Sequence, residues 1–146
     1  MNREILFRGK CIEDHCDELG KWIYGYLVYC HDEYEFDKPR VAEIIETDAA
    51  RLYTGEYNYW KAHEVDPDTV GQYIGLNDAN GNKIFEGDIL ESTVRRIGVP
   101  GARIIIKDIR RAEKISLWVS GYEVAGNIWD NPEMLEVEKN EQRNIV

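Results

Sequence analysis

The fold class is decided by the stretch Val70-Gly71-Gln72-Tyr73-Ile74-Gly75-Leu76-Asn77-Asp78-Ala79-Asn80-Gly81-Asn82-Lys83-Ile84-Phe85. It contains two apolar runs separated by a polar segment with Asn80-Gly81 at its centre. Because Asn-Gly readily takes the positive φ angles of a type I′ turn, the stretch predicts a β-hairpin. Glu86-Gly87-Asp88 follows, and a glycine at such a place in a strand marks a bulge or a close backbone approach. We therefore expect the second strand to bend at Gly87.

Further strands are predicted on both sides of the hairpin, where aromatic and β-branched residues gather between polar turns. Residues 22–30 form the predicted antiparallel partner of a strand at 4–12. A helix is predicted to begin with Asn131 as N-cap and Pro132 at the first helical position. The other predicted strands cover residues 41–46, 57–65, 89–94, 102–109, 117–119 and 122–124. For residues 41–46 a helix is the alternative, and a strand is favoured. We expect a single domain over residues 1–146, with 139–146 as a frayed tail.

These elements predict a mainly β fold, with α+β as the other possibility. The expected architecture is a curled antiparallel sheet or a small β-barrel-like domain. One or two short helices complete it, including one near the C-terminus.

Composition excludes several classes of function. The chain has 146 residues, which fits one domain, and its formal net charge is −10. That charge argues against direct binding of nucleic acid and against docking on an anionic membrane. The basic residues Arg95, Arg96, Arg103, Lys107, Arg110 and Arg111 are better explained as exposed strand and loop positions. Three cysteines and no visible targeting segment favour a cytoplasmic location.

Three stretches resemble a known family. Residues 65–89, from Val65 through Asp66-Pro67-Asp68 to Gly87-Asp88-Ile89, look like the central signature of YopX-like proteins. Residues 3–9 and 126–135 are similar to the opening and closing motifs of that family. The resemblance implies a small, mostly β, oligomeric protein encoded by phages or prophages, with no established enzymatic activity. The signature turn and bend residues are Asp66, Pro67, Gly71, Gly75, Asp78, Asn80, Gly81, Glu86, Gly87 and Asp88.

A metal site near the N-terminus is one chemical hypothesis. The candidate ligands are Cys11, His15, Cys16, Cys30 and His31. If Cys11 and Cys30 lay opposite each other on paired strands, four nitrogen and sulfur ligands could converge as tetrahedral zinc requires. Against this, there is no C-x2-C knuckle, and the adjacent Cys30 and His31 would point to opposite faces of a strand. A structural role for the cysteines is favoured, and no metal or cofactor is predicted.

A carboxylate pair and an aromatic cluster are the other candidate sites. Glu86 and Asp88 are two residues apart, so they share one strand face and could cooperate in acid–base chemistry or bind a divalent cation. The favoured interpretation is that they cap a tight turn. Tyr53, Tyr57, Tyr59 and Trp60 lack the basic residues of a base-stacking platform, so they are expected in the core or at a subunit interface.

We therefore predict a non-enzymatic accessory protein that self-associates and binds an unidentified host or phage protein. A sharper version makes it an acidic decoy of a nucleic-acid-binding host protein. The alternative is a small metal-dependent hydrolase that uses Glu86 and Asp88.

Overall fold

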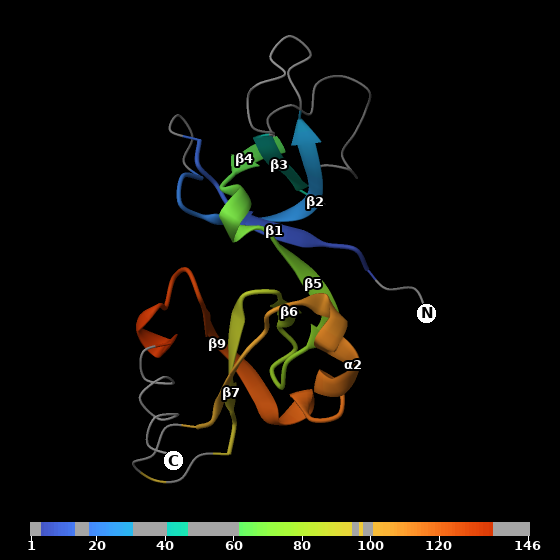
Figure 1. The fold of residues 1–146 in the computed structure, drawn as a ribbon, viewed down its shortest axis with the longest axis vertical. Helices are drawn as coiled ribbons and strands as arrows, with labels where there is room; N and C mark the ends of the chain where they lie inside the picture. Colours follow the sequence, from blue (N-terminus) through green and yellow to red (C-terminus); the bar gives the residue numbers. More distant parts are fainter. Residues whose placement is uncertain are drawn as a thin grey trace. The chain divides into compact units, whose positions relative to one another are not determined.

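The computed structural model describes residues 4–13, 18–30, 41–46, 62–94, 97 and 101–135. The chain forms two compact units, Met1–Gln72 and Tyr73–Val146 (Figure 1). The two units are described separately below. That they constitute a single domain stays a prediction.

The first unit is an antiparallel sheet. Its strands are β1 (Phe7–Lys10), β2 (Trp22–Cys30), β3 (Val41–Glu46) and β4 (Ala62–Val65), hydrogen-bonded in the order β4-β3-β2-β1. The first two residues of β5 (Gly71–Asn77) pair with β1, and a 3-10 turn, η2 (Pro67–Thr69), precedes them. The predicted antiparallel pairing of the first two strands is confirmed.

Side chains alternate between the two faces of this sheet. In β4, Ala62 and Glu64 are half-buried, whereas His63 and Val65 between and after them are buried. Beyond β1, an isolated bridge joins Cys11 to Val65 of β4, so the sheet curls back on itself. One face thereby becomes a small core of buried residues, namely Cys11, Ile23, Ala42, Ile44 and Val65.

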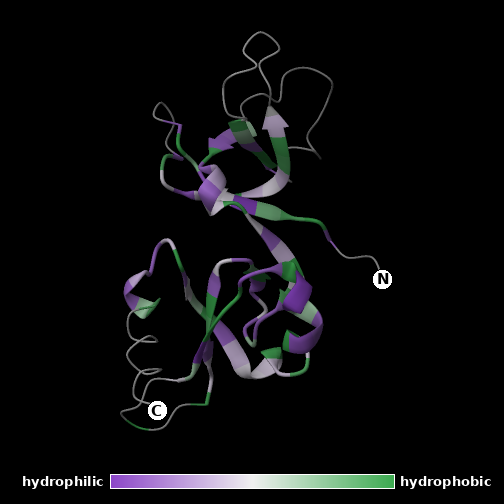
Figure 2. Cartoon of the chain, viewed as in Figure 1, coloured by the Kyte–Doolittle hydropathy of each residue, from purple (hydrophilic) through white to green (hydrophobic). Residues whose placement is uncertain are grey.

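The second unit contains the hairpin and a three-stranded sheet. The later residues of β5 pair with β6 (Lys83–Phe85), and β7 (Asp88–Ser92) lies between β8 (Arg103–Ile105) and β9 (Tyr122–Asn127). In β7, apolar Ile89 and Leu90 lie between hydrophilic ends (Figure 2). Three short helical segments join β8 to β9: η3 (Ile109–Arg111), α2 (Ala112–Ile115) and η4 (Val119–Gly121).

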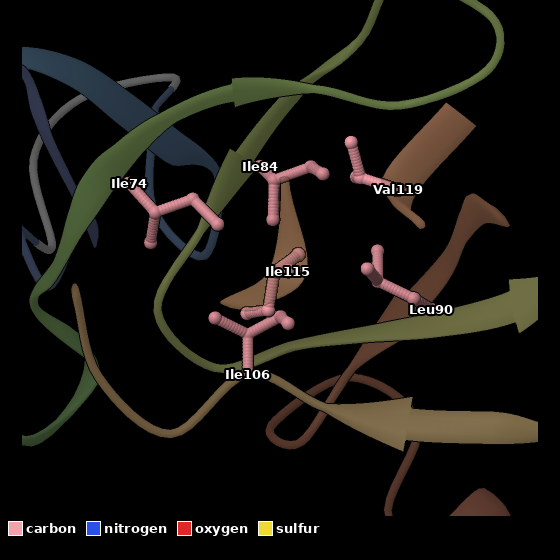
Figure 3. Packing of buried hydrophobic residues seen from close by; sticks show 6 residues of the cluster. All are labelled: Ile74, Ile84, Leu90, Ile106, Ile115 and Val119. Carbon is pink, nitrogen blue, oxygen red and sulfur yellow. The ribbon is translucent and has the colours of Figure 1, made fainter. Parts of the chain in front are cut away.

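The core of the second unit is built from aliphatic side chains of strands and helical turns. Figure 3 shows Ile115 of α2 close to Ile84 of β6 and to Ile106, with Leu90 of β7 and Val119 nearby. Ile84 and Leu90 have no exposed surface. This packing explains why the short helical segments form, since burial of their apolar residues compensates for weak local propensity.

We expect Ile84→Val to lower the free energy of unfolding by about 0.5–1.5 kcal/mol, because it deletes one methylene from a closed core. Leu117→Val is the matched control, since Leu117 is 86% exposed and its change should stay within about 0.5 kcal/mol. Urea denaturation followed by circular dichroism measures both. Equal losses in the two variants would contradict this account of the core.

The mainly β, antiparallel fold class is confirmed, and so is a short helix near the C-terminus, where residues 133–135 are helical. Several details differ from the sequence predictions. The strand predicted at 102–109 covers only Arg103–Ile105, because the chain turns into η3 at Ile109. The described strands form sheets that do not close into a barrel. Leu117–Val119 is not a strand, because Ile115 and Val119 enter the core at helical i, i+4 spacing. Among the described residues, no helix has the length and apolar character needed to cross a membrane.

Candidate functional site

One face of the first unit's sheet exposes aromatic and apolar side chains to solvent. Successive residues of a strand point to opposite faces, and on one face of β2 Tyr24, Tyr26 and Val28 are 44%, 49% and 38% exposed. Ile23, the residue before Tyr24, points to the other face and is buried. Isolated exposed apolar residues are ordinary, but a row of them along one strand marks a candidate contact surface. We call the surface formed by Tyr24, Tyr26 and Val28 the β2 face.

The two ends of the β2 face carry opposite charges. At its start, Lys10 Nζ lies 5.6 Å from the centroid of the Trp22 ring. At its far end, Val28 lies opposite Glu43 of β3, and Glu43 lies opposite Glu64 of β4. Residues directly opposite each other share a face of the sheet. The β2 face therefore runs from a basic end, through aromatic residues, to an acidic end.

Arg8 is a buried neighbour of the basic end of the β2 face. It lies opposite Tyr24, so its side chain belongs to the same face, and its Cζ is 4.6 Å from the centroid of the Trp22 ring. A guanidinium at this distance is attracted to the ring face. Arg8 is buried, which fixes this charge beside Trp22.

The carboxylates of Glu86 and Asp88 each accept a backbone hydrogen bond, from different segments of the second unit. Asp88 is buried, and its Oδ2 accepts from the N–H of Phe85 at 2.8 Å. Glu86 Oε2 accepts from the N–H of Ile109 at 3.1 Å. Gly87 between them has φ of 91° at the bend from β6 to β7. Both carboxylates thus organise backbone around the bend.

Asp78 is the centre of the hairpin loop. Its Oδ1 accepts from the N–H groups of Asn80 and Asn82 at 2.9 and 2.8 Å, and its Oδ2 accepts from the N–H of Val124 in β9 at 2.9 Å. Burial raises the pKa of Asp78, but the hydrogen bonds from Val124, Asn82 and Asn80 outweigh it and lower the pKa overall. The ionised carboxylate therefore holds the loop on β9.

The turn itself is longer than the sequence predicts. The N–H of Asp78 donates to the carbonyl of Asn82 at 2.8 Å, and the N–H of Gly81 donates to the carbonyl of Asp78 at 3.1 Å. Three residues, 79–81, thus lie between the paired positions in place of the two of a type I′ turn. Gly81, the last residue of the turn 78–81, takes φ of 83°, as glycine commonly does at this position of a three-residue hairpin loop. The hydrogen bonds that the Asp78 carboxylate accepts from Asn80 and Asn82 stabilise this wider loop.

The other signature residues lie at turns and irregular strand positions. The carboxylate of Asp66 accepts from the N–H of Asp68 at 3.0 Å, and Pro67 begins η2. Gly71 pairs with Arg8 of β1. Gly75 has φ of 86° where the register between β5 and β6 shifts. These residues shape the backbone at turns and at irregular strand positions.

Several candidate residues lie outside the described residues: Tyr53, Tyr57, Tyr59 and Trp60 of the aromatic cluster, and His15, Cys16 and His31 of the metal hypothesis. The backbone register does test one assumption of that hypothesis. Cys30 lies opposite Val41 of β3, so it does not face Cys11 across paired strands. Cys11 lies instead near Glu13 and His63.

Two of the basic residues noted in the sequence, Arg103 and Arg110, lie beside carboxylates. Arg103 Nε lies 3.5 Å from Glu91 Oε1, and Arg110 Nη2 lies 3.1 Å from Asp108 Oδ2. The hydrogen bond from the Arg110 side chain lowers the pKa of Asp108. Arg95 and Arg96 lie outside the described residues. These pairs reduce the positive charge available to a phosphate backbone.

Comparison with known proteins identifies the family. The family described as YopX protein matches residues 17–136, which is most of the chain. The chain belongs to the YopX family. The matched range includes the central signature at 65–89 and the whole closing motif at 126–135, whereas the opening motif at 3–9 lies before it.

The YopX assignment is accompanied by a structural similarity. The crystal structure of protein EF1440 from Enterococcus faecalis superposes with a TM-score of 0.52 at 22% identity, covering 92% of this chain and 99% of that one. At this identity the similarity shows a shared fold alone. Comparison with curated proteins finds no match.

Sequence reasoning did not single out the β2 face of this YopX protein. Residues 22–30 are predicted as a strand, but both of its faces carry apolar residues, so alternation alone could not say which face is covered. The signal that distinguishes the two faces is residue type. One face carries Tyr24 and Tyr26, whose hydroxyl groups favour contact with water, and the other carries the aliphatic Ile23 and Leu27.

Proposed function

We propose that this YopX protein is a phage- or prophage-derived, non-enzymatic protein-binding domain that self-associates through the β2 face. The observation that supports this is the row of exposed Tyr24, Tyr26 and Val28 between a basic and an acidic end. Tyrosine is enriched at protein interfaces because its ring packs while its hydroxyl stays hydrated.

The charge pattern favours a second copy of the same chain as the occupant. In a two-fold dimer the same surface meets itself in the opposite direction. Two β2 faces packed in this way would place Lys10 of one copy by Glu43 of the other, with Tyr26 near the axis. The face is therefore complementary to itself, although the net charge of −10 opposes association at longer range.

The other interpretations have less support. The hydrolase alternative requires Glu86 and Asp88 to act together, and both accept hydrogen bonds from backbone N–H groups at the bend. The acidic-decoy version rests on the net charge of −10 alone. A salt-sensitive complex with a nucleic-acid-binding protein in a pull-down from bacterial lysate would favour it.

We expect Tyr26→Lys to raise the dimer dissociation constant about tenfold or more, because it brings two like charges together at the centre of the interface. Tyr29→Lys is the matched control. Tyr29 is 51% exposed on the same strand but belongs to the opposite face, so this change should leave the dimer intact. Light scattering coupled to size-exclusion chromatography over a range of concentrations measures both. A wild-type monomer at all concentrations, or equal dissociation of the two variants, would contradict the proposal.

A charge exchange tests the direction of packing. Lys10→Glu and Glu43→Lys should each weaken the dimer, and the double variant should restore it. Within one chain these residues are separated by about 20 Å along β2, which is well beyond the screening length of about 8 Å at physiological salt. Rescue in the double variant would therefore report a contact between two copies. Additive weakening would exclude this arrangement.

A further inference from the structure

Three potential metal ligands converge in the first unit, on the face of the sheet opposite to the β2 face. The thiol of Cys11, the carboxylate of Glu13 and the imidazole of His63 each provide an atom, and these atoms lie within 4.8 Å of one another. Cys11 and His63 are buried at 1% and 8% exposed, and Glu13 is half-buried. This group differs from an ordinary surface ion pair, because two of its three side chains are shielded from water.

Strand register brings the three residues together. Cys11 bridges Val65 in an antiparallel sense, and the N–H of Ile12 donates to the carbonyl of Glu64 at 3.0 Å. Continuing this pairing by two residues places Glu13 directly opposite His63. Cys11 and Glu13 share a face because they are two residues apart. A Cys-x-Glu pair in the segment that follows β1 thus faces a histidine of β4.

The orientation of Glu13 and His63 is fixed by further contacts. Glu13 Oε1 accepts from the N–H of Glu64 at 2.7 Å, while Glu13 Oε2 lies 3.3 Å from His63 Nδ1. On the other side of the ring, His63 Nε2 lies 3.8 Å from Glu46 Oε1. A metal-binding histidine usually has its second nitrogen turned toward a carboxylate, which sets the tautomer and ring orientation. Glu46 is placed to do this.

We propose that Cys11, Glu13 and His63 bind one zinc ion per chain, with Glu46 as a positioning residue for His63. Thiolate sulfur, imidazole nitrogen and carboxylate oxygen are the three ligand types that zinc takes in proteins. Three protein ligands leave the fourth position of a tetrahedral ion to water. Binding requires a deprotonated Cys11 and a neutral His63, so the affinity increases with pH. This site does not depend on the proposed self-association.

The test uses the full chain, freed of metal with a chelator and then titrated with Zn²⁺ by calorimetry and with Co²⁺ by absorption. We expect one ion per chain, a thiolate-to-cobalt charge-transfer band, and thermal stabilisation by Zn²⁺ as binding to the folded state requires. Cys11→Ser should abolish the charge-transfer band. Glu13→Gln and His63→Gln should each lower the affinity about tenfold or more, and Glu46→Gln should lower it about tenfold with the stoichiometry retained.

Two controls distinguish zinc binding at Cys11, Glu13 and His63 from misfolding of the variants and from binding elsewhere in the chain. Circular dichroism identifies variants that fail to fold, and the half-buried Glu13 and Glu46 provide variants that leave the core intact. Cys30→Ser and His31→Gln remove two other candidate ligands of the metal hypothesis considered from the sequence and should leave binding unchanged. The proposal is overturned if the chain binds no metal, which would leave Glu13, His63 and Glu46 as a polar cluster that only orders the sheet. It is also overturned if binding is lost in Cys30→Ser and retained in Cys11→Ser.

Discussion

Gly87→Ala is expected to lower the free energy of unfolding by about 2–6 kcal/mol, the sum of a backbone term and a packing term. Gly87 has φ of 91°, a conformation that residues with a Cβ rarely adopt. A Cβ at this position would also lie 2.2 Å from Cζ3 of Trp129, so the indole would have to move. Urea denaturation followed by tryptophan fluorescence and circular dichroism measures the loss.

Gly81→Ala is the matched control for this prediction. Gly81 has a similar φ of 83°, but a Cβ there would meet nothing within 4 Å. Only the backbone term of about 1–2 kcal/mol should remain. In a Trp129→Ala background, Gly87→Ala should fall to this smaller cost, because the obstructing ring is gone. A loss at Gly87 no greater than that at Gly81 would show that contact with Trp129 does not constrain the bend.

Asp78→Asn is expected to cost about 2–4 kcal/mol at pH 7, because hydrogen bonds to a charged acceptor contribute about 1.5–3 kcal/mol each and the losses are partly offset by the amide oxygen. The carboxylate accepts from three backbone N–H groups, those of Asn80, Asn82 and Val124. Asp68→Asn, at an exposed position in η2, is the control and should change stability by less than about 0.5 kcal/mol.

The contribution of Asp78 should disappear in acid. Its folded pKa lies below the ordinary value of 3.8, so the unfolded chain takes up this proton first as the pH falls. The stabilisation is therefore complete above about pH 5, by the linkage between proton binding and folding, and is lost as the pH falls through the folded pKa. The stability difference between wild type and Asp78→Asn should shrink below about pH 4. A difference that stays constant down to about pH 2 would contradict the role assigned to the ionised carboxylate.

Much of the fold could be predicted because local chemistry and tertiary structure agree. The bounds of β2 match the prediction at residues 22–30, where a run of aromatic and β-branched residues follows Gly20. The hairpin was predicted from Asn80-Gly81, and its turn type was wrong because Asp78 stabilises a longer loop. The short helix α2 has too few residues to show a period, and its formation depends on the burial of Ile115.

The candidate sites were harder to predict, because they depend on contacts between distant segments. The pairing of Cys11 with Val65 brings Glu13 to His63, fifty residues away in sequence. The metal hypothesis instead assumed that Cys11 faces Cys30, which a strand pattern alone can neither support nor exclude. The order of the strands in the sheet decides which residue lies opposite Cys11. That order is set by the packing of β1 to β4 against one another, which a local sequence pattern does not describe.

The hydrogen bonds of Asp78 also bear on the order of events in folding. Two of its backbone donors, Asn80 and Asn82, lie within four residues, so these bonds can form as soon as the hairpin turns. The third, Val124, is 46 residues away, and closing a loop of that length is slower and entropically more costly. We expect the carboxylate to stabilise the turn early in folding and to accept the hydrogen bond from Val124 only later, when β9 reaches the hairpin. The same side chain would thus belong both to the first local structure of the second unit and to its last long-range contact.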